Sequence, residues 1–132
     1  TEANAVNAGS RPLSSMTPTV LISKDGTRRI VVGGSGGPVI ISGTLQVISN
    51  IIDFGMDPSA AVSAPRVHHQ WMPHALMVDE ELSADTVQAL EARGHVVKRR
   101  TIGSSIQVVV RDADGTTTGA SDPRKGGWPA GG

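Results

Sequence analysis

The chain has 132 residues, of which 38% are hydrophobic, and twelve basic residues balance twelve acidic ones. This length suits one domain, and the neutral balance gives no general attraction to nucleic acid or to an anionic membrane surface. Cysteine is absent, which excludes disulfides, thiolate catalysis and cysteine-ligated zinc. No apolar run approaches the roughly 20 residues that a membrane helix needs.

The first half of the chain predicts a hairpin followed by a helix. Two β-branched runs at 19–23 and 28–32 flank Asp25-Gly26, which is a strong hairpin signal. After the glycine-rich run 33–37, apolar residues recur at three- and four-residue spacing over 40–52. This pattern predicts a helix whose apolar stripe is too wide for a surface helix.

The second half predicts shorter elements. Asp57-Pro58 is typical of a helix start, and Ser83 is the expected N-cap of a helix that ends at Arg93. Apolar and β-branched runs predict strands at 74–79, 96–97, 106–110 and 116–118, the last two joined by a turn. Because helices and strands alternate irregularly, the pattern favours an α+β layered sheet over a doubly wound parallel one.

A glycine-rich turn between a strand and a helix is the first candidate site. Gly33-Gly-Ser-Gly-Gly37 places backbone N–H groups at a helix N-terminus, where unpaired donors and the helix dipole favour negative charge. Such a turn could hold a phosphate, a carboxylate or the oxyanion of an acyl-transfer intermediate, or be a plain tight turn. Its spacing fits neither a P-loop nor a dinucleotide-binding fingerprint.

Other polar residues carry weaker signals. Ser14 and Ser15 lie in a loop, where their hydroxyls could donate to a substrate carboxylate or cap local backbone groups. Adjacent histidines at 68 and 69 point apart, so no metal site is expected. Asp122 and Arg124 predict an exposed local ion pair worth at most about 1 kcal/mol. Arg66 is expected to be a packing or ion-pair residue.

Four blocks in the same order closely resemble the γ-glutamyltranspeptidase family. They are Arg11-Pro-Leu-Ser-Ser-Met-Thr-Pro-Thr19, the run 33–37 before a helix that contains Gln46, Ala64-Pro-Arg-Val-His-His-Gln70, and Gly119-Ala-Ser-Asp-Pro-Arg124. Four ordered blocks are far more specific than any one of them. The resemblance covers nearly the whole chain, from residue 4 to residue 124.

The resemblance implies part of a four-layer αββα sandwich of the N-terminal-nucleophile hydrolase type, in which a precursor cuts itself to expose a threonine. That threonine attacks a γ-glutamyl amide, and the acyl-enzyme passes to water or an amino acid. Gly36 and Gly37 match the pair whose N–H groups stabilise the oxyanion. Ser14 and Ser15 match the pair that binds the α-carboxylate region of the substrate. No cofactor and no metal are implied.

The sequence departs from the family pattern at two places. Pro38-Val39 follows the turn where the family often has Ser-Arg, which makes a related acylase or amidohydrolase the alternative enzyme. The family's nucleophile lies some tens of residues upstream of the Arg11 block, and Thr1 matches the segment just before that block. Thr1 is therefore not expected to be the catalytic threonine.

The resemblance makes 1–132 a single domain fragment, the C-terminal part of a small subunit, with probable arms at 1–10 and 125–132. We expect it to act on a small γ-glutamyl substrate such as glutathione. Its expected partners are the rest of the small subunit and the large subunit of the same precursor, and the chain alone is expected to be inactive. A non-catalytic light-chain-like module is the alternative from another class. The bacterial family implies a periplasmic or extracellular location.

Overall fold

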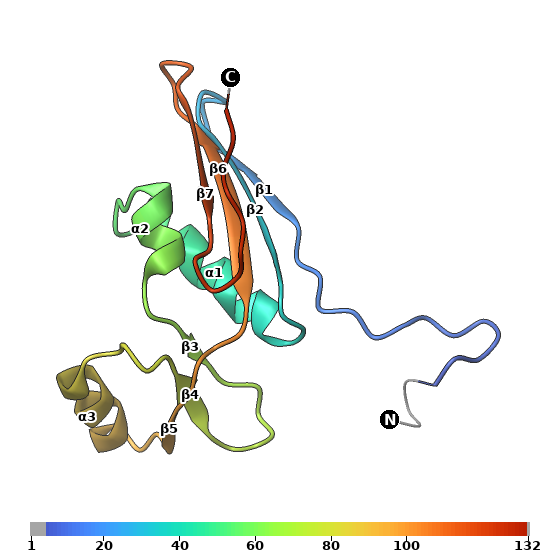
Figure 1. Cartoon of the computed structure of the whole chain (residues 1–132), viewed down its shortest axis with the longest axis vertical. Helices are drawn as coiled ribbons and strands as arrows, with labels where there is room; N and C mark the ends of the chain where they lie inside the picture. Colours follow the sequence, from blue (N-terminus) through green and yellow to red (C-terminus); the bar gives the residue numbers. More distant parts are fainter. Residues whose placement is uncertain (1–4, 132) are drawn as a thin grey trace.

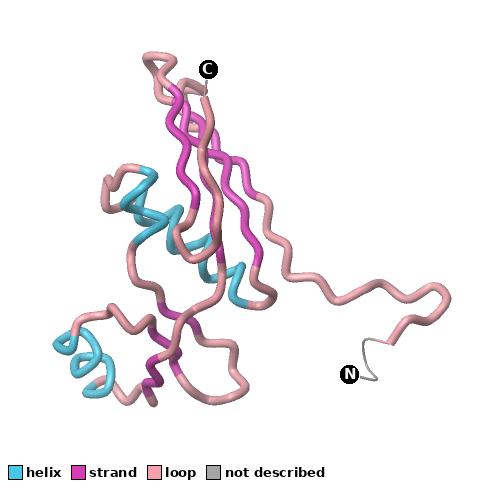
Figure 2. Tube along the Cα trace, viewed as in Figure 1, coloured by secondary structure: helices cyan, strands magenta, loops and turns pink. Residues whose placement is uncertain are grey.

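The strands of the computed structural model, which describes residues 5–131, form two sheets (Figures 1 and 2). The larger sheet is antiparallel, with the order β1-β2-β6-β7, and α1 and α2 cover one of its faces. The smaller sheet has the order β3-β4-β5 and lies beside α3. The bounds are β1 Thr19–Ile22, β2 Arg29–Ser35, α1 Val39–Ile52, α2 Pro58–Ser63, β3 Val67–His68, β4 Leu76–Val78, α3 Ala84–Ala92, β5 Val97–Arg99, β6 Ser105–Arg111 and β7 Thr117–Ser121.

Both predicted hairpins form, and an aspartate side chain organises each turn. Between β1 and β2, Asp25 Oδ1 accepts a hydrogen bond from the N–H of Thr27 at 3.1 Å. Between β6 and β7, Asp114 Oδ1 accepts one from the N–H of Thr116 at 2.8 Å. Hydrogen bonds from Ser23 and Thr27 lower the pKa of Asp25, and those from Thr116 lower the pKa of Asp114. These local interactions explain why the turns were readable from sequence.

Strand β2 is longer than predicted. It continues through the first glycines of the glycine-rich run to Ser35, which pairs with Ser105 of β6. A Cβ atom on Gly34 would lie 2.6 Å from Ser105 O, so only glycine allows the two strands to approach this closely. Of the glycine-rich run, only Gly36 and Gly37 therefore form the turn.

Helix α1 packs one face on the larger sheet. Val47 and Ile51 are at most 1% exposed and join the aliphatic core with residues of β2 and β6. The wide apolar stripe predicted a helix buried on more than one side. Instead, Ile41, Leu45 and Ile52 are at least 50% exposed in this chain. The helix thus has a second apolar face that no described residue covers.

The two shorter helices begin at the predicted caps. Asp57 Oδ1 accepts hydrogen bonds from the N–H groups of Ser59 at 2.9 Å and Ala60 at 3.0 Å, at the start of α2. Ser83 Oγ accepts one from the N–H of Thr86 at 3.2 Å, at the start of α3. Each cap satisfies backbone donors that the first turn of a helix leaves unpaired.

The smaller sheet differs most from the prediction. Strand β4 covers only the centre of the predicted strand 74–79, and β5 begins one residue after the expected start at Val96. Strand β3 was not predicted, because its two residues carry no periodic signal. It exists through pairing of Val67 with Val78. Strands β4 and β5 run parallel.

Residues 5–18 and 125–131, at the two ends of the described chain, contain no helix or strand. Residues 5–18 extend away from the sheets, and residues 125–131 run back beside the larger sheet (Figure 1). Thr1 and the other residues at 1–4, and residue 132, lie outside the described residues. Over 5–131, none of the helices has the length and apolar character that crossing a bilayer demands.

Candidate active site

The Gly36-Gly37 turn joins the end of β2 to α1. Both glycines are exposed, and the N–H of Ile40 donates to Gly37 O at 3.0 Å. None of the hydrogen bonds described for turns and loops starts from the N–H of Gly36 or Gly37. Pro38, at the N-cap, supplies no side-chain acceptor. The turn therefore presents unpaired donors at the positive end of a helix.

The surroundings of the two glycines differ. Gly36 has a φ of +137°, and a Cβ there would lie 2.7 Å from Ser104 Cα and 2.9 Å from Gly103 O. Gly37 has a φ of +65°, but a Cβ there would meet nothing within 4 Å. Both conformations favour glycine. Gly36 thus packs against the loop before β6, whereas Gly37 faces open space. A ligand could reach the turn from the side of Gly37.

A buried arginine holds the loop on which Gly36 rests. Arg66 Nη1 donates to Ser104 O at 2.9 Å, and Arg66 Nη2 lies 2.7 Å from Asp122 Oδ2. The side chains of Arg66 and Asp122 are 1% and 0% exposed. Arg66 was expected to be a packing or ion-pair residue, and it is a buried ion-pair residue. Its partner, Asp122, lies in the block 119–124 that resembles the γ-glutamyltranspeptidase family.

Asp79 and Arg124 extend this pair into a buried network. Arg124 Nη2 lies 2.6 Å from Asp79 Oδ2, and Arg124 Nη1 lies 3.2 Å from Asp122 Oδ1. Asp79 also accepts hydrogen bonds from the N–H groups of Arg66 and Ile102. The prediction of an exposed local pair between Asp122 and Arg124 is wrong, because Asp122 is fully buried and two arginines share its carboxylate.

Competing effects act on the carboxyl group of Asp122. Burial by itself raises its pKa. Hydrogen bonds from the N–H groups of Ile106 at 2.9 Å and Arg124 at 3.0 Å, together with Arg66, favour the charged form. These interactions outweigh burial, so the pKa of Asp122 lies below its ordinary value. The carboxyl group of Asp122 is therefore charged at neutral pH.

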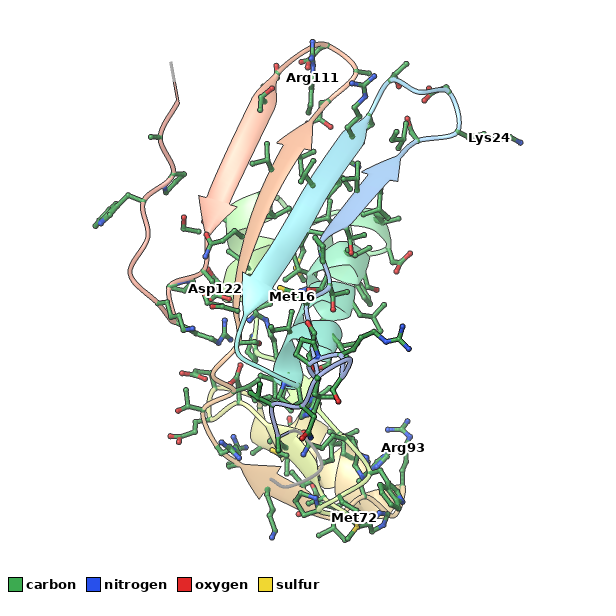
Figure 3. The ribbon with its side chains drawn as sticks, turned by 90° about the vertical axis from the view of Figure 1, so that its right-hand side faces the viewer. Met16, Lys24, Met72, Arg93, Arg111 and Asp122 are labelled. Carbon is green, nitrogen blue, oxygen red and sulfur yellow. The ribbon has the colours of Figure 1, made fainter. Side chains whose placement is uncertain are left out.

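The β1–β2 hairpin brings the predicted serine pair to the end of the sheet that carries the glycine turn. Thr19 pairs with Val32, so the chain before β1 approaches the chain that follows β2. Figure 3 shows Met16 at this end of the sheet. Ser14 and Ser15 directly precede Met16 in the sequence. The structure therefore places both predicted parts of the site at one end of the hairpin.

Both serine hydroxyls can still donate. The N–H of Met16 donates to Ser14 Oγ at 3.3 Å, which leaves the Ser14 proton unused. None of the described hydrogen bonds uses the hydroxyl of Ser15. Ser14 is exposed and Ser15 is half-buried. Within residues 5–131, no hydrogen bond links either serine to the glycine turn, so a ligand between them has both sets of donors available.

The adjacent histidines point apart, as predicted. His68 is 4% exposed, and its ring nitrogens lie 2.7 Å from Ser42 Oγ and 3.0 Å from Gln70 Oε1. His69 is exposed and meets His74 edge-to-face, with ring centroids 5.5 Å apart. Across the described part of the chain, no group of three or more metal-ligating side chains is placed to hold an ion.

Some residues that support the turn were not found from the sequence. Asp79 follows a buried strand, which is the only signal that could have marked it as a buried carboxylate. Ser104 carries no signal, because its role depends on contact with Gly36, which is far away in the sequence. Such contacts follow from tertiary packing alone.

Comparison with known sequences identifies relatives along the whole chain. The family model described as gamma-glutamyltranspeptidase matches residues 1–132. The glutathione hydrolase proenzyme of Escherichia coli is 46% identical over 123 residues, which cover 93% of this chain and 21% of that protein. Glutathione hydrolase 2 of Arabidopsis thaliana is 39% identical over 144 residues, which cover 98% of this chain and 25% of that protein.

Comparison with solved structures gives the same result. A mutant of Helicobacter pylori gamma-glutamyltranspeptidase superposes with a TM-score of 0.82 at 40% identity, covering 95% of this chain and 69% of that chain. Such structures are N-terminal-nucleophile hydrolase sandwiches, which confirms the predicted α+β fold within a four-layer sandwich. The chain spans about a fifth to a quarter of the length of the two curated relatives. It belongs to the gamma-glutamyltranspeptidase family.

Proposed function

We propose that this chain is part of an enzyme that transfers or hydrolyses γ-glutamyl groups, with glutathione and related γ-glutamyl amides as substrates. The observation that carries the proposal is the pair of exposed, unpaired N–H donors at Gly36 and Gly37, at the start of α1. The names of the relatives, which are glutathione hydrolases, support it. In this proposal Gly36 and Gly37 form the oxyanion hole, and Ser14 and Ser15 bind the α-carboxylate region of the substrate.

The proposed reaction passes through an ester of a catalytic threonine. The threonine oxygen adds to the γ-carbonyl carbon, and negative charge collects on the carbonyl oxygen. The carbon–nitrogen bond then breaks, and the amine leaves with the proton that the threonine released. Water or an amine next attacks the ester, takes the γ-glutamyl group, and its proton returns to the threonine oxygen. No residue of this chain is assigned as that threonine.

The glycine turn acts while charge collects on the carbonyl oxygen. Preorganised N–H groups lower the energy of this state more than that of the neutral amide, and losing one such donor costs about 10²–10³ in rate. The dipole of α1 favours negative charge at the same place. Open space at Gly37 leaves room for the reacting carbonyl.

The serine pair supports binding rather than bond breaking. A substrate α-carboxylate is negatively charged, and hydroxyl donors to a charged acceptor form the stronger class of hydrogen bond. Ser14 and Ser15 have hydroxyl protons that no described residue accepts. Their place before β1 lets them hold the substrate beside the end of β2, where the turn begins.

We further propose that the rest of the small subunit and the large subunit of the same precursor complete the site. The name proenzyme of the Escherichia coli relative supports processing of a precursor. Leu45 on α1 and Val20, Val31 and Val109 on the open face of the larger sheet are at least 44% exposed. Apolar faces of this kind mark interaction surfaces, and a layered sandwich covers them.

The complete enzyme that contains this chain provides the test. Incubation with γ-glutamyl-p-nitroanilide should release p-nitroaniline. Mass spectrometry of the acid-quenched enzyme should find a γ-glutamyl ester on a threonine. A folded, processed enzyme that cleaves no amide and forms no ester contradicts the proposal and supports a non-catalytic module.

One observation favours a second candidate, an acylase or amidohydrolase of the same superfamily. Pro38 and Val39 line a cavity beside Gly36 and bring no charge to it. An apolar wall at this position suits a less polar acyl group than γ-glutamyl. For this candidate, γ-glutamyl-p-nitroanilide stays intact while another anilide of a non-polar acid is cleaved by the same enzyme.

A further inference from the structure

Two arginines face each other across β2 and β6, at the end of the larger sheet that lies away from the glycine turn. Arg29 is the register partner of Arg111, and Ser35 is that of Ser105 at the other end of the same pairing. Figure 3 shows Arg111 at the end of the sheet opposite Met16. Side chains directly opposite in an antiparallel pair have Cβ atoms about 4.5–5.5 Å apart, and like charges there are destabilising. The fold therefore holds two positive charges close together at a cost in stability.

Neither guanidinium group is paired with a carboxylate. Both arginines are exposed, and none of the hydrogen bonds and ion pairs described within residues 5–131 involves their side chains. Asp112 directly follows Arg111, but its Oδ1 lies 2.8 Å from Arg28 Nε, so its charge is already balanced. All five N–H donors of each guanidinium group are thus available to a ligand.

The aspartates of the two neighbouring hairpin turns are engaged as well. Asp25 Oδ1 accepts hydrogen bonds from the N–H of Thr27 at 3.1 Å and from its hydroxyl at 2.9 Å. Asp114 Oδ1 accepts one from the N–H of Thr116 at 2.8 Å. Neither aspartate is among the residues that line the space between the turns. These carboxylates therefore stabilise their own turns and leave the two arginines unpaired.

A cavity of about 220 Å³ lies between the two turns. Arg29 and Arg111 line it together with Thr27 of the first turn and Ala113 of the second, and the remaining lining residues are Asp112 and two glycines. None of the described hydrogen bonds starts from the N–H of Ala113, so the wall also offers a backbone donor. Small-molecule sites usually measure about 300–1,000 Å³, so this smaller and polar cavity suits a small ion.

The charge around the cavity indicates which kind of ion fits. Because Arg28 balances Asp112, Arg29 and Arg111 leave two positive charges. A phosphate group carries about 1.5–2 negative charges at pH 7, and guanidinium groups bind its oxygens in a bidentate way. A carboxylate has one charge and two oxygens, so it would leave one arginine unmatched. The cavity therefore suits a doubly charged oxyanion better than a carboxylate.

We propose that Arg29 and Arg111 bind a small, doubly charged oxyanion of the phosphate or sulfate class between the two turns, with the N–H of Ala113 as a further donor. The ion offsets the repulsion between the guanidinium groups and connects the two hairpins. The site lies where β2 begins and β6 ends, and both turns extend beyond α1 and α2 (Figure 1). The seven residues of β2 separate it from the glycine turn by about 20 Å, so it does not depend on the proposed function.

Calorimetric titration of the complete enzyme with inorganic phosphate tests the site, without any γ-glutamyl substrate and at an ionic strength held constant with chloride. One phosphate should bind per chain. Arg29→Met and Arg111→Met keep the length of the side chain but remove its charge, so each should raise the Kd about tenfold. Arg111→Lys should keep part of the affinity, because the charge remains. An unmodified enzyme that binds no phosphate overturns the proposal.

Lys24→Met is the matched control. Lys24 is an exposed cation of the β1–β2 turn that does not line the cavity, so its loss removes the same charge from the same hairpin without the contact. Screening by salt should limit its effect on the Kd to a factor of about two. If Lys24→Met weakens binding as much as Arg29→Met does, a general attraction between charges explains the binding and the proposal is overturned.

Thermal unfolding separates ligand binding from a structural role of the arginines. Phosphate should raise the melting temperature of the unmodified enzyme and leave that of the variant with Arg29→Met and Arg111→Met combined unchanged. Without phosphate, the combined variant should melt no lower than the unmodified enzyme, because the repulsion is gone. A combined variant that melts lower without phosphate shows that the arginines stabilise the fold by another contact, which overturns the proposal.

A carboxylate from another part of the complete enzyme is the competing occupant. Carbodiimide would then join the amine introduced by Arg111→Lys to that carboxylate, and mass spectrometry would find the cross-linked peptide. Such a cross-link overturns the proposal. Phosphate binding that depends on both arginines, without a cross-link, supports it.

Discussion

Arg66 and Asp122 form an ion pair with an Nη2–Oδ2 distance of 2.7 Å, and water reaches neither side chain. Arg66 precedes β3 and Asp122 follows β7, so the pair connects two sequence blocks that are far apart in the chain. The same guanidinium binds Ser104 O, and Ser104 lies beneath Gly36. The shape of the proposed oxyanion hole therefore depends on a buried charge pair.

Removing one partner of this pair should destabilise the enzyme strongly. Asp122→Ala leaves Arg66 buried without its carboxylate, and breaking a buried pair in this way costs about 3–5 kcal/mol. Urea denaturation of the complete enzyme measures the change. Asp112→Ala is the control, because the Arg28–Asp112 pair is 41% and 45% exposed and should contribute at most about 1 kcal/mol. Equal losses in the two variants contradict this account.

The low pKa of Asp122 predicts a loss of stability in acid. The unfolded chain has the ordinary pKa of about 3.9, and the folded value lies lower. The stabilisation is therefore complete above about pH 4 and is lost as the pH falls through the folded pKa. The urea midpoint should fall more steeply below about pH 4 in the unmodified enzyme than in Asp122→Asn. If the urea midpoints of the two proteins fall in parallel below about pH 4, the pKa of Asp122 does not contribute to the acid dependence of stability.

The elements that were predicted correctly depend on local signals. Asp25 organises a hairpin, and Asp57 and Ser83 begin helices, through side-chain contacts with residues only a few positions away. From its place between a strand and a helix, the glycine turn could be either a plain tight turn or an anion site, and its role as an anion site stays a prediction. Family resemblance then indicated a role for Ser14 and Ser15, which residue chemistry alone left open.

The elements that were missed depend on partners far away in the chain. Asp122 is buried because Arg66 and Arg124 surround its carboxylate, which the local sequence does not reveal. Strand β3 exists only through pairing with β4. The cavity beside Gly36 brings Arg100 to the turn from the other sheet. No pattern within one segment carries that information.

The two glycines of the turn should differ in their tolerance of substitution. Gly36→Ala places a Cβ 2.7 Å from Ser104 Cα, so the turn must move. Its N–H groups would then no longer point at the carbonyl oxygen of the substrate. We expect turnover of γ-glutamyl-p-nitroanilide to fall about 10²–10³-fold. Gly37→Asn meets no atom within 4 Å, and asparagine tolerates positive φ, so the fold should survive with reduced activity. The melting temperature of Gly36→Ala should therefore be lower than that of Gly37→Asn. Equal melting temperatures of the two variants contradict the expected difference in tolerance.

The cap of α2 should contribute measurably to stability. Asp57→Ala removes the acceptor of two backbone N–H groups, which should cost about 0.5–2 kcal/mol of the free energy of unfolding. Asp57→Asn keeps an oxygen at the same position and should lose far less. Denaturation of both variants under the same conditions tests the cap. A loss that is the same for Ala and Asn would mean that the carboxylate charge matters rather than the hydrogen bonds.

Replacement of the serine pair should weaken substrate binding in a way that depends on the substrate carboxylate. With Ser14→Ala and Ser15→Ala combined, the KM for γ-glutamyl-p-nitroanilide should rise about tenfold, because hydrogen bonds to a charged acceptor are lost. Ser10→Ala, an exposed serine earlier in the same segment, is the control. The 4-aminobutyryl anilide lacks the α-carboxylate, so the serine variant should lose little with it. A loss of the same size with both anilides would show that the serines shape the segment before β1 and do not bind the carboxylate.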